Sequence, residues 1–371
     1  MTVVVVAGAL ANKVDIGGEP WFRMSWVRGF ERLGLDVRFV EELERAAPRE
    51  LEWFRDVMER FDMTDGATLL ADGEAIAGPA LDELLALAPE ATLVNMSGHL
   101  TLPRLFAAFR ARVFVDADPG FTQIWHAQGN PGARVDGHDL HFTIGELIGT
   151  AGCTVPTSGI DWKHVRQPVV LEDWPVTSPG ELDRFTTIAT WRGPFGPLEH
   201  DGHTYGLKVH EFRKVIELPR RSPQRFELAL DIHPAEERDL EALRENGWKL
   251  ADPRAVARTP DEFRAYVQGS SAEFSVAQGV YVGTGCAWFS DRTVRYLASG
   301  RPALVQDTGF SRTLPVGDGL VPFTNIEDAV AGAADIADRY AEHCAAARRI
   351  AEEKFAAEVV LADFCERAGI R

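Results

Sequence analysis

The chain begins with short apolar runs that alternate with segments of helical spacing. Val3–Val6 is a continuous β-branched run, which is typical of a strand buried on both faces. Trp21–Leu33 then places apolar residues at helical spacing, Gly34 is suited to end that helix, and Val37–Val40 is the next apolar run. This order predicts a strand–helix–strand unit.

The same alternation continues through the first half of the chain. Further buried strands are predicted over Thr68–Leu70, Thr92–Met96 and Arg112–Val115, with helices over Pro79–Leu87 and Pro103–Phe109. Strands that alternate with helices form a parallel sheet covered on both faces, and the right-handed crossover rule restricts its topology.

A second α/β pattern follows a segment rich in proline and glycine, residues 167–183, which we interpret as an interdomain linker. The strands predicted beyond it are Thr186–Ala189, Phe226–Leu230, Ala272–Val276 and Ala303–Gln306, the helices are Tyr205–Ile216, Pro234–Glu245, Thr259–Val267 and Asp291–Ala298, and residues 326–369 have a helical pattern. The predicted domains are residues 1–166 and 184–340, followed by a helical segment, 341–371. Two Rossmann-like α/β domains are expected to face a cleft, with ligands at the carboxyl ends of the strands.

The length and charge of the chain limit the number of domains and the classes of partner that are expected. The 371 residues suit two domains. Acidic residues outnumber basic ones by 56 to 39, a net charge of −17, which disfavours binding to nucleic acid or to an anionic membrane. An anionic small molecule could still bind where cations gather. Abundant alanine and arginine with scarce lysine are typical of a GC-rich bacterial genome.

The cysteines and the N-terminus indicate a soluble, cytoplasmic protein. Cys153, Cys286, Cys344 and Cys365 are widely spaced and form no C-x-x-C pair, so neither a disulfide framework nor a zinc site is predicted. Residues 1–10 lack a basic region and are interpreted as a strand instead of a signal peptide. No apolar stretch is long enough to span a membrane.

The most informative segment covers residues 288–310, which read as loop, helix, Gly-Pro turn, strand and loop. Ser290 or Asp291 can cap the helix, whose N-terminus presents free N–H groups and a partial positive charge. Arg292 and Thr293 add donors at the same end. This arrangement suits a diphosphate. The alternative is a capped surface helix that leads into a core strand.

The run Leu297-Ala298-Ser299-Gly300-Arg301-Pro302, followed by a strand and Asp307-Thr308-Gly309, resembles the donor-binding segment of GT-B glycosyltransferases. In that superfamily the helix N-terminus and the loop after the next strand hold the nucleotide diphosphate and the sugar. The resemblance covers the last third of the chain in detail. It implies donor contacts at Ser290, Asp291, Arg292, Thr293, Asp307, Thr308 and Gly309.

The sequence departs from that pattern at two positions. Many retaining GT-B enzymes carry two glutamates across this helix, where this chain has Ala287 and Arg295. Either the ribose is held differently, or Arg295 contacts phosphate. The stereochemical outcome is therefore not carried over.

Two further cations lie at the start of the second domain. Arg192 follows its first predicted strand, and Lys208 stands where the next helix begins. GT-B enzymes that resemble this chain place an Arg and a Lys there on the donor diphosphate. Cations next to a departing diphosphate stabilise its developing charge, and one such contact is typically worth about 10²–10³ in rate. The alternative is two solvent-exposed bases.

The first domain is expected to hold the acceptor and a catalytic base. Asp118 and His99 are the leading candidates, followed by Asp15 and Glu146, because each follows a predicted strand. Histidine has an intrinsic pKa near neutrality, and burial raises the pKa of a carboxylate. The alternative for each is a turn or cap residue.

Other chemistries are less well supported. Asp116-Ala117-Asp118 resembles the metal-binding Asp-x-Asp of GT-A glycosyltransferases, but those use one domain. His138 and His141 fit a polar turn better than a metal site. Gly279-x-x-x-Gly283-x-Gly285 is interpreted as a flexible loop, because it is not a dinucleotide fingerprint. We therefore predict neither a metal nor a cofactor.

The sequence predicts a glycosyltransferase, of the hexosyltransferase class, that uses a nucleoside-diphosphate sugar and an unknown acceptor. Domain closure would align the two substrates and exclude water. The alternatives are a nucleotide-sugar epimerase or hydrolase of the same fold, a catalytically degenerate nucleotide-sugar-binding protein, and a two-lobed binding protein. Nucleic acid is not an expected partner.

Overall fold

The computed structural model describes residues 2–177 and 180–371, whose contacts form two compact units. Unit 1 contains the chain up to Ile144, together with Pro156–Val170 and Ala356–Arg371. Unit 2 contains Gly145–Val155 and Leu171–Phe355. Met1 of the first predicted strand and residues 178 and 179 of the predicted linker lie outside the described residues.

Unit 1 is built on an 8-stranded sheet with the order β4-β3-β2-β1-β5-β6-β7-β8. Its strands are β1 (Val3–Ala7), β2 (Asp36–Leu43), β3 (Ala67–Ala71), β4 (Glu74–Ala77), β5 (Ala91–Met96), β6 (Ala111–Asp116), β7 (Leu140–Thr143) and β8 (Trp162–His164). Neighbouring strands are parallel except β3 and β4, which are antiparallel. The expected parallel sheet is therefore present, with an antiparallel strand added at one edge.

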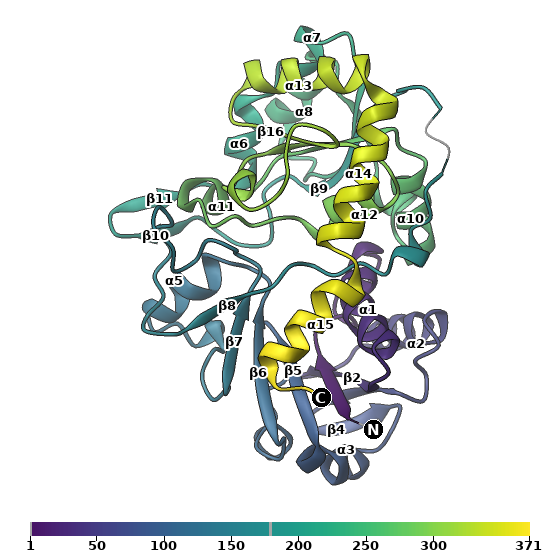
Figure 1. Ribbon diagram of the computed structural model, residues 1–371, viewed down its shortest axis with the longest axis vertical. Helices are drawn as coiled ribbons and strands as arrows, with labels where there is room; N and C mark the ends of the chain where they lie inside the picture. The colour runs from purple at the N-terminus through teal and green to yellow at the C-terminus, as the bar shows by residue number, and fades with distance from the viewer. Residues whose placement is uncertain (1, 178–179) are drawn as a thin grey trace. The chain divides into compact units, whose positions relative to one another are not determined.

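Helices connect these strands and return to cover the sheet (Figure 1). They are α1 (Gly18–Arg32), α2 (Pro48–Arg60), α3 (Leu81–Leu87), α4 (Pro103–Phe106), α5 (Phe121–Ala127) and α15 (Ala357–Ala368), with short 3-10 turns η1 (Ala88–Glu90) and η2 (Pro131–Ala133). A Cβ on Gly29 of α1 would lie 2.4 Å from Leu361 of α15, so the two helices pack closely at this glycine. Trp26 and Phe364 meet edge to face between them, at 5.3 Å.

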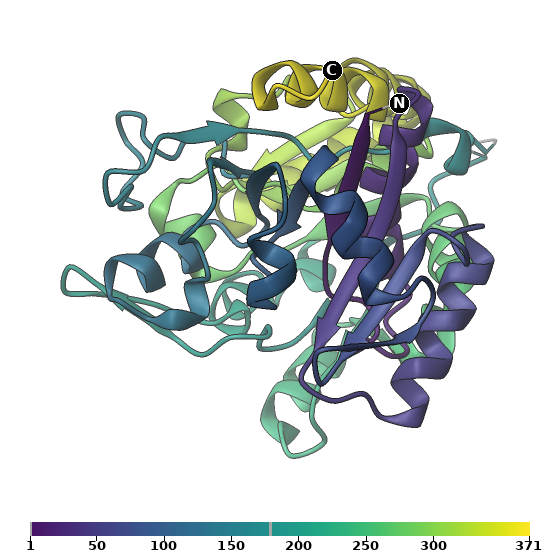
Figure 2. The same cartoon turned by 90° about the horizontal axis from the view of Figure 1, so that it is seen from below.

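The last helix thereby belongs to unit 1, although it is the most distant in sequence. Its far end brings the C-terminus beside the N-terminus, as Figure 2 shows, and Thr2 donates a hydrogen bond to the carbonyl of Arg371. The helical pattern predicted over residues 326–369 is thus divided among three helices, of which only α15 packs on the first sheet.

Unit 2 contains a 6-stranded, all-parallel sheet with the order β13-β12-β9-β14-β15-β16. Its strands are β9 (Phe185–Thr190), β12 (Phe226–Asp231), β13 (Lys249–Ala251), β14 (Ala272–Ser275), β15 (Ala303–Gln306) and β16 (Leu320–Phe323). Its helices are α6 (Lys208–Lys214), α7 (Leu218–Arg221), α8 (Glu237–Glu245), α9 (Pro253–Val256), α10 (Pro260–Gln268), α11 (Gly279–Thr284), α12 (Asp291–Ala298), α13 (Ile326–Asp338) and α14 (Tyr340–Lys354), with η3 (Leu171–Asp173) and η4 (Phe310–Arg312).

Unit 2 also differs from the sequence-based expectation. Residues 198–205 form a hairpin of β10 (Leu198–His200) and β11 (His203–Tyr205) that was not predicted, and Tyr205, the first residue of a predicted helix, belongs to it. Gly279–Thr284 was predicted to be a flexible loop, which is wrong, because it forms α11. Its glycines serve close packing: a Cβ on Gly283 would lie 2.9 Å from the ring of Tyr205.

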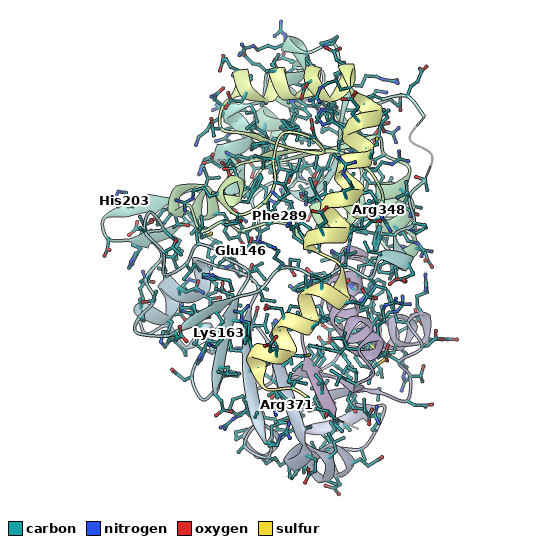
Figure 3. All side chains as sticks on the ribbon, viewed as in Figure 1. Glu146, Lys163, His203, Phe289, Arg348 and Arg371 are labelled. Carbon is teal, nitrogen blue, oxygen red and sulfur yellow. The ribbon has the colours of Figure 1, made fainter. Side chains whose placement is uncertain are left out.

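The arginine at position 348 fixes α14 inside unit 2. Its guanidinium, labelled in Figure 3, donates to the carbonyl of Ala298 at 2.6 Å and to that of Trp174 at 3.0 Å. Ala298 is the last residue of α12, so α14 satisfies a carbonyl that the helix end leaves without an intrahelical partner. No helix among the described residues is long and apolar enough to cross a lipid bilayer.

Candidate functional site

The strands of the 6-stranded sheet of unit 2 end along one edge, because all six run in the same direction. At this edge the side chain of Gln306, the last residue of β15, accepts a hydrogen bond from the backbone N–H of Ala277 at 3.1 Å. It also donates to Glu211 of α6 at 2.8 Å. The loop after β14 and the helix after β9 are thereby held at the end of β15.

A buried ion pair lies beneath this edge. Arg292, the second residue of α12, donates through Nε to Glu273 of β14 at 2.7 Å. Its other nitrogens donate to the carbonyl of Ile188 at 2.7 Å and to the hydroxyl of Ser275 at 2.6 Å. Burial raises the pKa of Glu273, and Arg292 opposes that rise. The side chain of Arg292 therefore joins α12 to β9 and β14.

Lys208 begins α6 close to this pair. Its backbone N–H donates to the side chain of Gln278 at 3.0 Å. Burial, followed by the nearby charge of Arg292, lowers the pKa of Lys208 to about 7, while Glu273 acts in the opposite direction. Two cationic side chains thus share one buried carboxylate, and an additional anion would offset the excess positive charge.

Gln278 connects Lys208 to the loop that carries Arg192. A Cβ on Gly193 would lie 1.7 Å from the amide nitrogen of Gln278, and the φ of Gly193 is +88°. Next in the chain, a Cβ on Gly279 would lie 2.5 Å from the carbonyl oxygen of Gly206. Because Gly193 and Gly279 have no side chains, three loops can approach one another closely at the start of α6. A site that binds a ligand through backbone groups requires such a close approach.

Arg192 itself is exposed and lies at a cavity. Its side chain forms an ion pair with Glu236 at 2.5 Å. The cavity measures about 950 Å³ at the ends of β9, β12 and β13. Its lining residues are Thr190, Trp191, Arg192, Gly193, Pro194, Leu230, Asp231, Ile232, His233, Pro234, Glu236, Asp252, Pro253 and Arg254. Lys208 does not line this cavity. Arg192 and Lys208 are linked instead through Gly193 and Gln278.

The N-terminus of α12 is arranged differently from the expected cap. Ser290 occupies the N-cap position, but its side chain makes no capping hydrogen bond. Ser290 and Thr293 are buried, and Asp291 pairs with Arg295 at 3.0 Å. The side chain of Arg295 is completely buried above the ring of Trp174. Arg295 therefore supports the helix and is not placed on the surface, where it could contact phosphate.

The loop after β15 is tied to its neighbours. Asp307 accepts hydrogen bonds from the backbone of Gly309 at 2.8 Å and from the hydroxyl of Ser311 at 2.5 Å. Thr308 donates to the carbonyl of Trp288 at 2.5 Å. Gly309 has a φ of +99°, and a Cβ there would lie 3.0 Å from the carbonyl of Gly285. These side chains shape the loop, so a ligand would meet mainly its backbone.

The candidate base Asp118 follows β6, whose last residue is Asp116. The carboxylate of Asp116 is fully buried and accepts from Thr122 at 2.7 Å, Gln123 at 2.7 Å and Thr143 at 2.6 Å. It also accepts from the backbone N–H of Asp118 at 3.0 Å. Burial raises the pKa of Asp116. Asp116 therefore orders the turn, and Asp118 is the half-buried carboxylate that this turn presents.

His99 follows β5 and is half-buried. Burial, then the charges of Arg23, Arg134 and Lys13, lowers the pKa of His99 to about 3. The expectation of a near-neutral pKa is therefore wrong for this histidine. Its imidazole stays uncharged at neutral pH and is a weak base.

The two remaining carboxylates are also engaged. Asp15 forms an ion pair with Arg49. Glu146, labelled in Figure 3, accepts from Thr313 at 2.9 Å and belongs to unit 2, although it was assigned to the first domain. Asp118 follows β6 as expected, and its role as the base stays a prediction.

The histidines of the Gly137–His141 segment are structural. His138 packs edge to face on Phe106 and Phe114, at 5.0 and 5.1 Å, and one ring nitrogen lies 3.0 Å from the side chain of Asn95. Burial lowers the pKa of His138 to about 4. Within residues 2–177 and 180–371 no group of three or more His, Cys, Asp or Glu side chains is placed to hold a metal ion.

Comparison with known proteins identifies the architecture. No family model matches the chain, and no curated protein matches it in sequence. An α-glucosyltransferase in complex with UDP-glucose and DNA matches 99% of this chain and 98% of its own, with a TM-score of 0.61 and 10% identity. HepE of Anabaena, in complex with UDP and glucose, matches 100% of both chains, with a TM-score of 0.61 and 11% identity. A sucrose-phosphate synthase of Thermosynechococcus elongatus matches 99% of this chain and 98% of its own, with a TM-score of 0.55 and 10% identity.

The chain has the GT-B fold. Every residue that the resemblance assigned to the donor lies in unit 2, in its loops and at the starts of its helices α6 and α12. The structure brings Lys208 and Arg292 together and places Arg192 one residue from the loop contact with Gln278. It places the side chains of Asp307 and Arg295 in structural roles.

Sequence reasoning missed three residues of this edge. Glu273 and Ser275 lie inside a strand that has the pattern of ordinary core, and Gln278 lies directly before the segment interpreted as flexible. The signal for Glu273 is an acidic residue in an apolar run, because a buried carboxylate needs a cation. Gln278 has no comparable signal, since its role depends on glycines that are distant in sequence.

Proposed function

We propose that this chain transfers a sugar, a hexose, from a nucleoside-diphosphate sugar to an acceptor. The diphosphate would bind beside Lys208 and Arg292, at the N-terminal ends of α6 and α12. The carrying observation is that burial, followed by the nearby charge of Arg292, lowers the pKa of the ligand-free Lys208 to about 7, while the carboxylate of Glu273 acts in the opposite direction. A diphosphate would supply the compensating charge and stabilise the ammonium form.

The similar structures support the same ligand class. HepE is described in complex with UDP and glucose, and the α-glucosyltransferase in complex with UDP-glucose. Uridine nucleotides are therefore the first donors to test. The α-glucosyltransferase also contains DNA. For this chain the net charge of −17 favours an acceptor other than nucleic acid, which stays a prediction.

The proposal is tested by ligand-induced thermal stabilisation. UDP, GDP, TDP, ADP, CMP and NAD are compared with and without EDTA. A nucleoside diphosphate at about 100 times its Kd should add about 2.7 kcal/mol to the free energy of unfolding. We expect a shift from one of them that EDTA leaves unchanged, because neither a metal nor a cofactor is part of the proposal.

The matched variants are Lys208→Met and Lys249→Met. Lys249 is exposed on β13, in the same unit. The shift should disappear in the first variant and persist in the second. If no nucleoside diphosphate produces a shift, or if only NAD does, the glycosyltransferase proposal fails.

A second candidate is a nucleotide-sugar-binding protein without turnover. It is favoured by the departures at Ala287 and Arg295, since the buried Arg295 is occupied by Asp291 and is not available to hold a ribose. Release of UDP from UDP-glucose distinguishes the possibilities. A transferase releases UDP faster with an acceptor, a hydrolase or epimerase consumes donor without one, and the binding protein does neither.

A further inference from the structure

Three cations of unit 1 surround His99. Lys13 lies in the loop after β1, Arg23 lies on α1, and Arg134 follows η2, so they come from separate segments of the chain. Each of them lowers the pKa of His99, after burial, which places all three near the same imidazole. His99 directly follows the Ser97–Gly98 turn at the end of β5.

Glycines bring the two arginines to the sheet edge. A Cβ on Gly8, the residue after β1, would lie 3.2 Å from Cγ of Arg23. A Cβ on Gly98 would lie 2.6 Å from Cβ of Arg134, so this arginine is packed directly against the turn before His99. Arg23 and Arg134 are therefore packed against the carboxyl ends of β1 and β5.

The charge of this cluster is not balanced. Arg23 is 7% exposed and pairs with Glu19, but its Nε is buried and has no hydrogen-bond partner in the described part of the chain. Neither Lys13 nor Arg134 forms an ion pair with any described residue. In a protein of net charge −17, unpaired cations that gather at one point indicate a ligand of opposite charge.

The carboxylate of Glu41, which interacts with the charge of Arg23, does not remove the imbalance. Glu41 is 1% exposed and accepts hydrogen bonds from the backbone N–H groups of Leu10 and Ala11, at 2.8 and 2.7 Å. Burial raises the pKa of Glu41 to about 7, although Arg23 opposes the shift. Glu41 is therefore only partly ionised near neutral pH, and its oxygens are committed to the loop.

We propose that Lys13, Arg23 and Arg134 bind an anionic group, a phosphate or a carboxylate, on the acceptor molecule beside His99. Arg134 is exposed and Lys13 is half-buried, so both can reach a ligand from solvent, while the arginines offer forked donors that match either oxyanion. That the anionic group belongs to an acceptor rests on the proposed function, whereas the anion site itself does not. The inference names an anionic acceptor class for the enzyme.

The test is an NMR titration of the full-length chain with ¹⁵N-labelled histidine. Inorganic phosphate and acetate are the two probes, at constant ionic strength and about pH 5, and His99→Gln identifies the signal. A bound anion should raise the pKa of His99 by about one unit or more, which is a tenfold change in its protonation equilibrium. The probe that binds more tightly shows whether the site prefers a phosphate or a carboxylate.

Matched variants locate the site. Lys13→Gln combined with Arg134→Gln should weaken binding of the stronger probe about tenfold or more, because two charge-assisted contacts are lost. Arg55→Gln is the control, since Arg55 is exposed on the outside of α2 and should leave the affinity unchanged. The inference is overturned if neither probe moves the His99 signal at millimolar concentrations, or if the double variant binds as tightly as the wild type.

A parallel titration with UDP separates this inference from the proposed function. Phosphate binding that depends on Lys13 and Arg134, without nucleotide binding that depends on Lys208, supports the anion site and contradicts the glycosyltransferase proposal. Nucleotide binding at Lys208, without any response of His99 to either probe, contradicts the anion site and leaves the donor site supported.

Discussion

Arg292 donates to the buried carboxylate of Glu273 at 2.7 Å, and this pair joins helix α12 to the sheet beneath it. Glu273 is fully buried, so the guanidinium is the cation that compensates its charge. Together with burial, the same guanidinium lowers the pKa of Lys208. The ion pair that supports the fold and the proposed diphosphate site therefore interact electrostatically.

Removing one partner of this pair should destabilise the chain strongly. Arg292→Met leaves the Glu273 carboxylate buried without its cation, and we expect a loss of about 3–5 kcal/mol in the free energy of unfolding. Urea denaturation measures it, with the exposed Arg244→Met as control. Adding Glu273→Gln should restore part of the loss. Equal losses from Arg292→Met and Arg244→Met would contradict the role of the pair.

Lys208 should make the stability of the ligand-free chain depend on alkaline pH. Its pKa is about 7 when folded, against 10.5 for a lysine exposed to water. Between these values the unfolded chain binds the proton and the folded chain does not, so stability rises with pH across this window. Lys208→Met should lack this rise. If the stability of the two proteins depends on pH in the same way, folding does not lower the pKa of Lys208.

The close approach at Gly279 should tolerate no side chain. In Gly279→Ala the new Cβ would meet the backbone of Gly206 at 2.5 Å, and backbone cannot move as a side chain can. We expect a loss of about 1–3 kcal/mol in stability and weaker nucleotide binding. Gly196→Ala is the matched control, because nothing lies within 4 Å of its Cβ. The two variants are compared by thermal unfolding with and without nucleotide.

His99 should affect stability in acid and not the neutral pH–rate profile. Its folded pKa is about 3, against 6.5 for a histidine exposed to water. Between these values the unfolded state takes up the proton, so His99 reduces stability as pH falls through this window. His99→Gln should make the acid loss of stability shallower. If transfer activity instead follows a group titrating near 6.5 that His99→Gln abolishes, His99 is the base after all.

Asp118 is the better candidate for the base. Asp118→Asn should lower the rate of transfer by about 10²–10⁴ and leave nucleotide affinity unchanged, since the loss of a general base affects the chemical step. Asp116→Asn provides the contrast: it should reduce stability, because Asp116 accepts four hydrogen bonds inside the turn. Normal activity in Asp118→Asn would exclude it as the base.

Much of the fold was predictable from local pattern. Val3–Val6 and Ala303–Val305 are continuous apolar runs, and in the structure they lie inside parallel sheets, so burial on both faces dictates their composition. The hairpin at residues 198–205 could not be predicted in this way. Its strands are three residues long and largely exposed, and they carry no periodic signal.

The candidate site was predictable only in part. Lys208 could be singled out because lysine is scarce and it begins a helix after a strand. Arg295 was misjudged because sequence does not show which face of a helix is turned inward, and its charge is satisfied by Asp291 four residues earlier. Gln278 could not be found, since its importance arises from Gly193, which is far from it in the chain.

Isothermal titration calorimetry of UDP, or of the nucleoside diphosphate that stabilises best, is the most direct test of the central claim. At about pH 8, titrations in two buffers of different ionisation enthalpy report proton uptake on binding. The free Lys208 is then mostly neutral, and a bound diphosphate should return it to the ammonium form. We predict uptake of close to one proton per nucleotide in the wild type and almost none in Lys208→Gln. Binding without proton uptake, or equal uptake in both proteins, would contradict a diphosphate bound at Lys208.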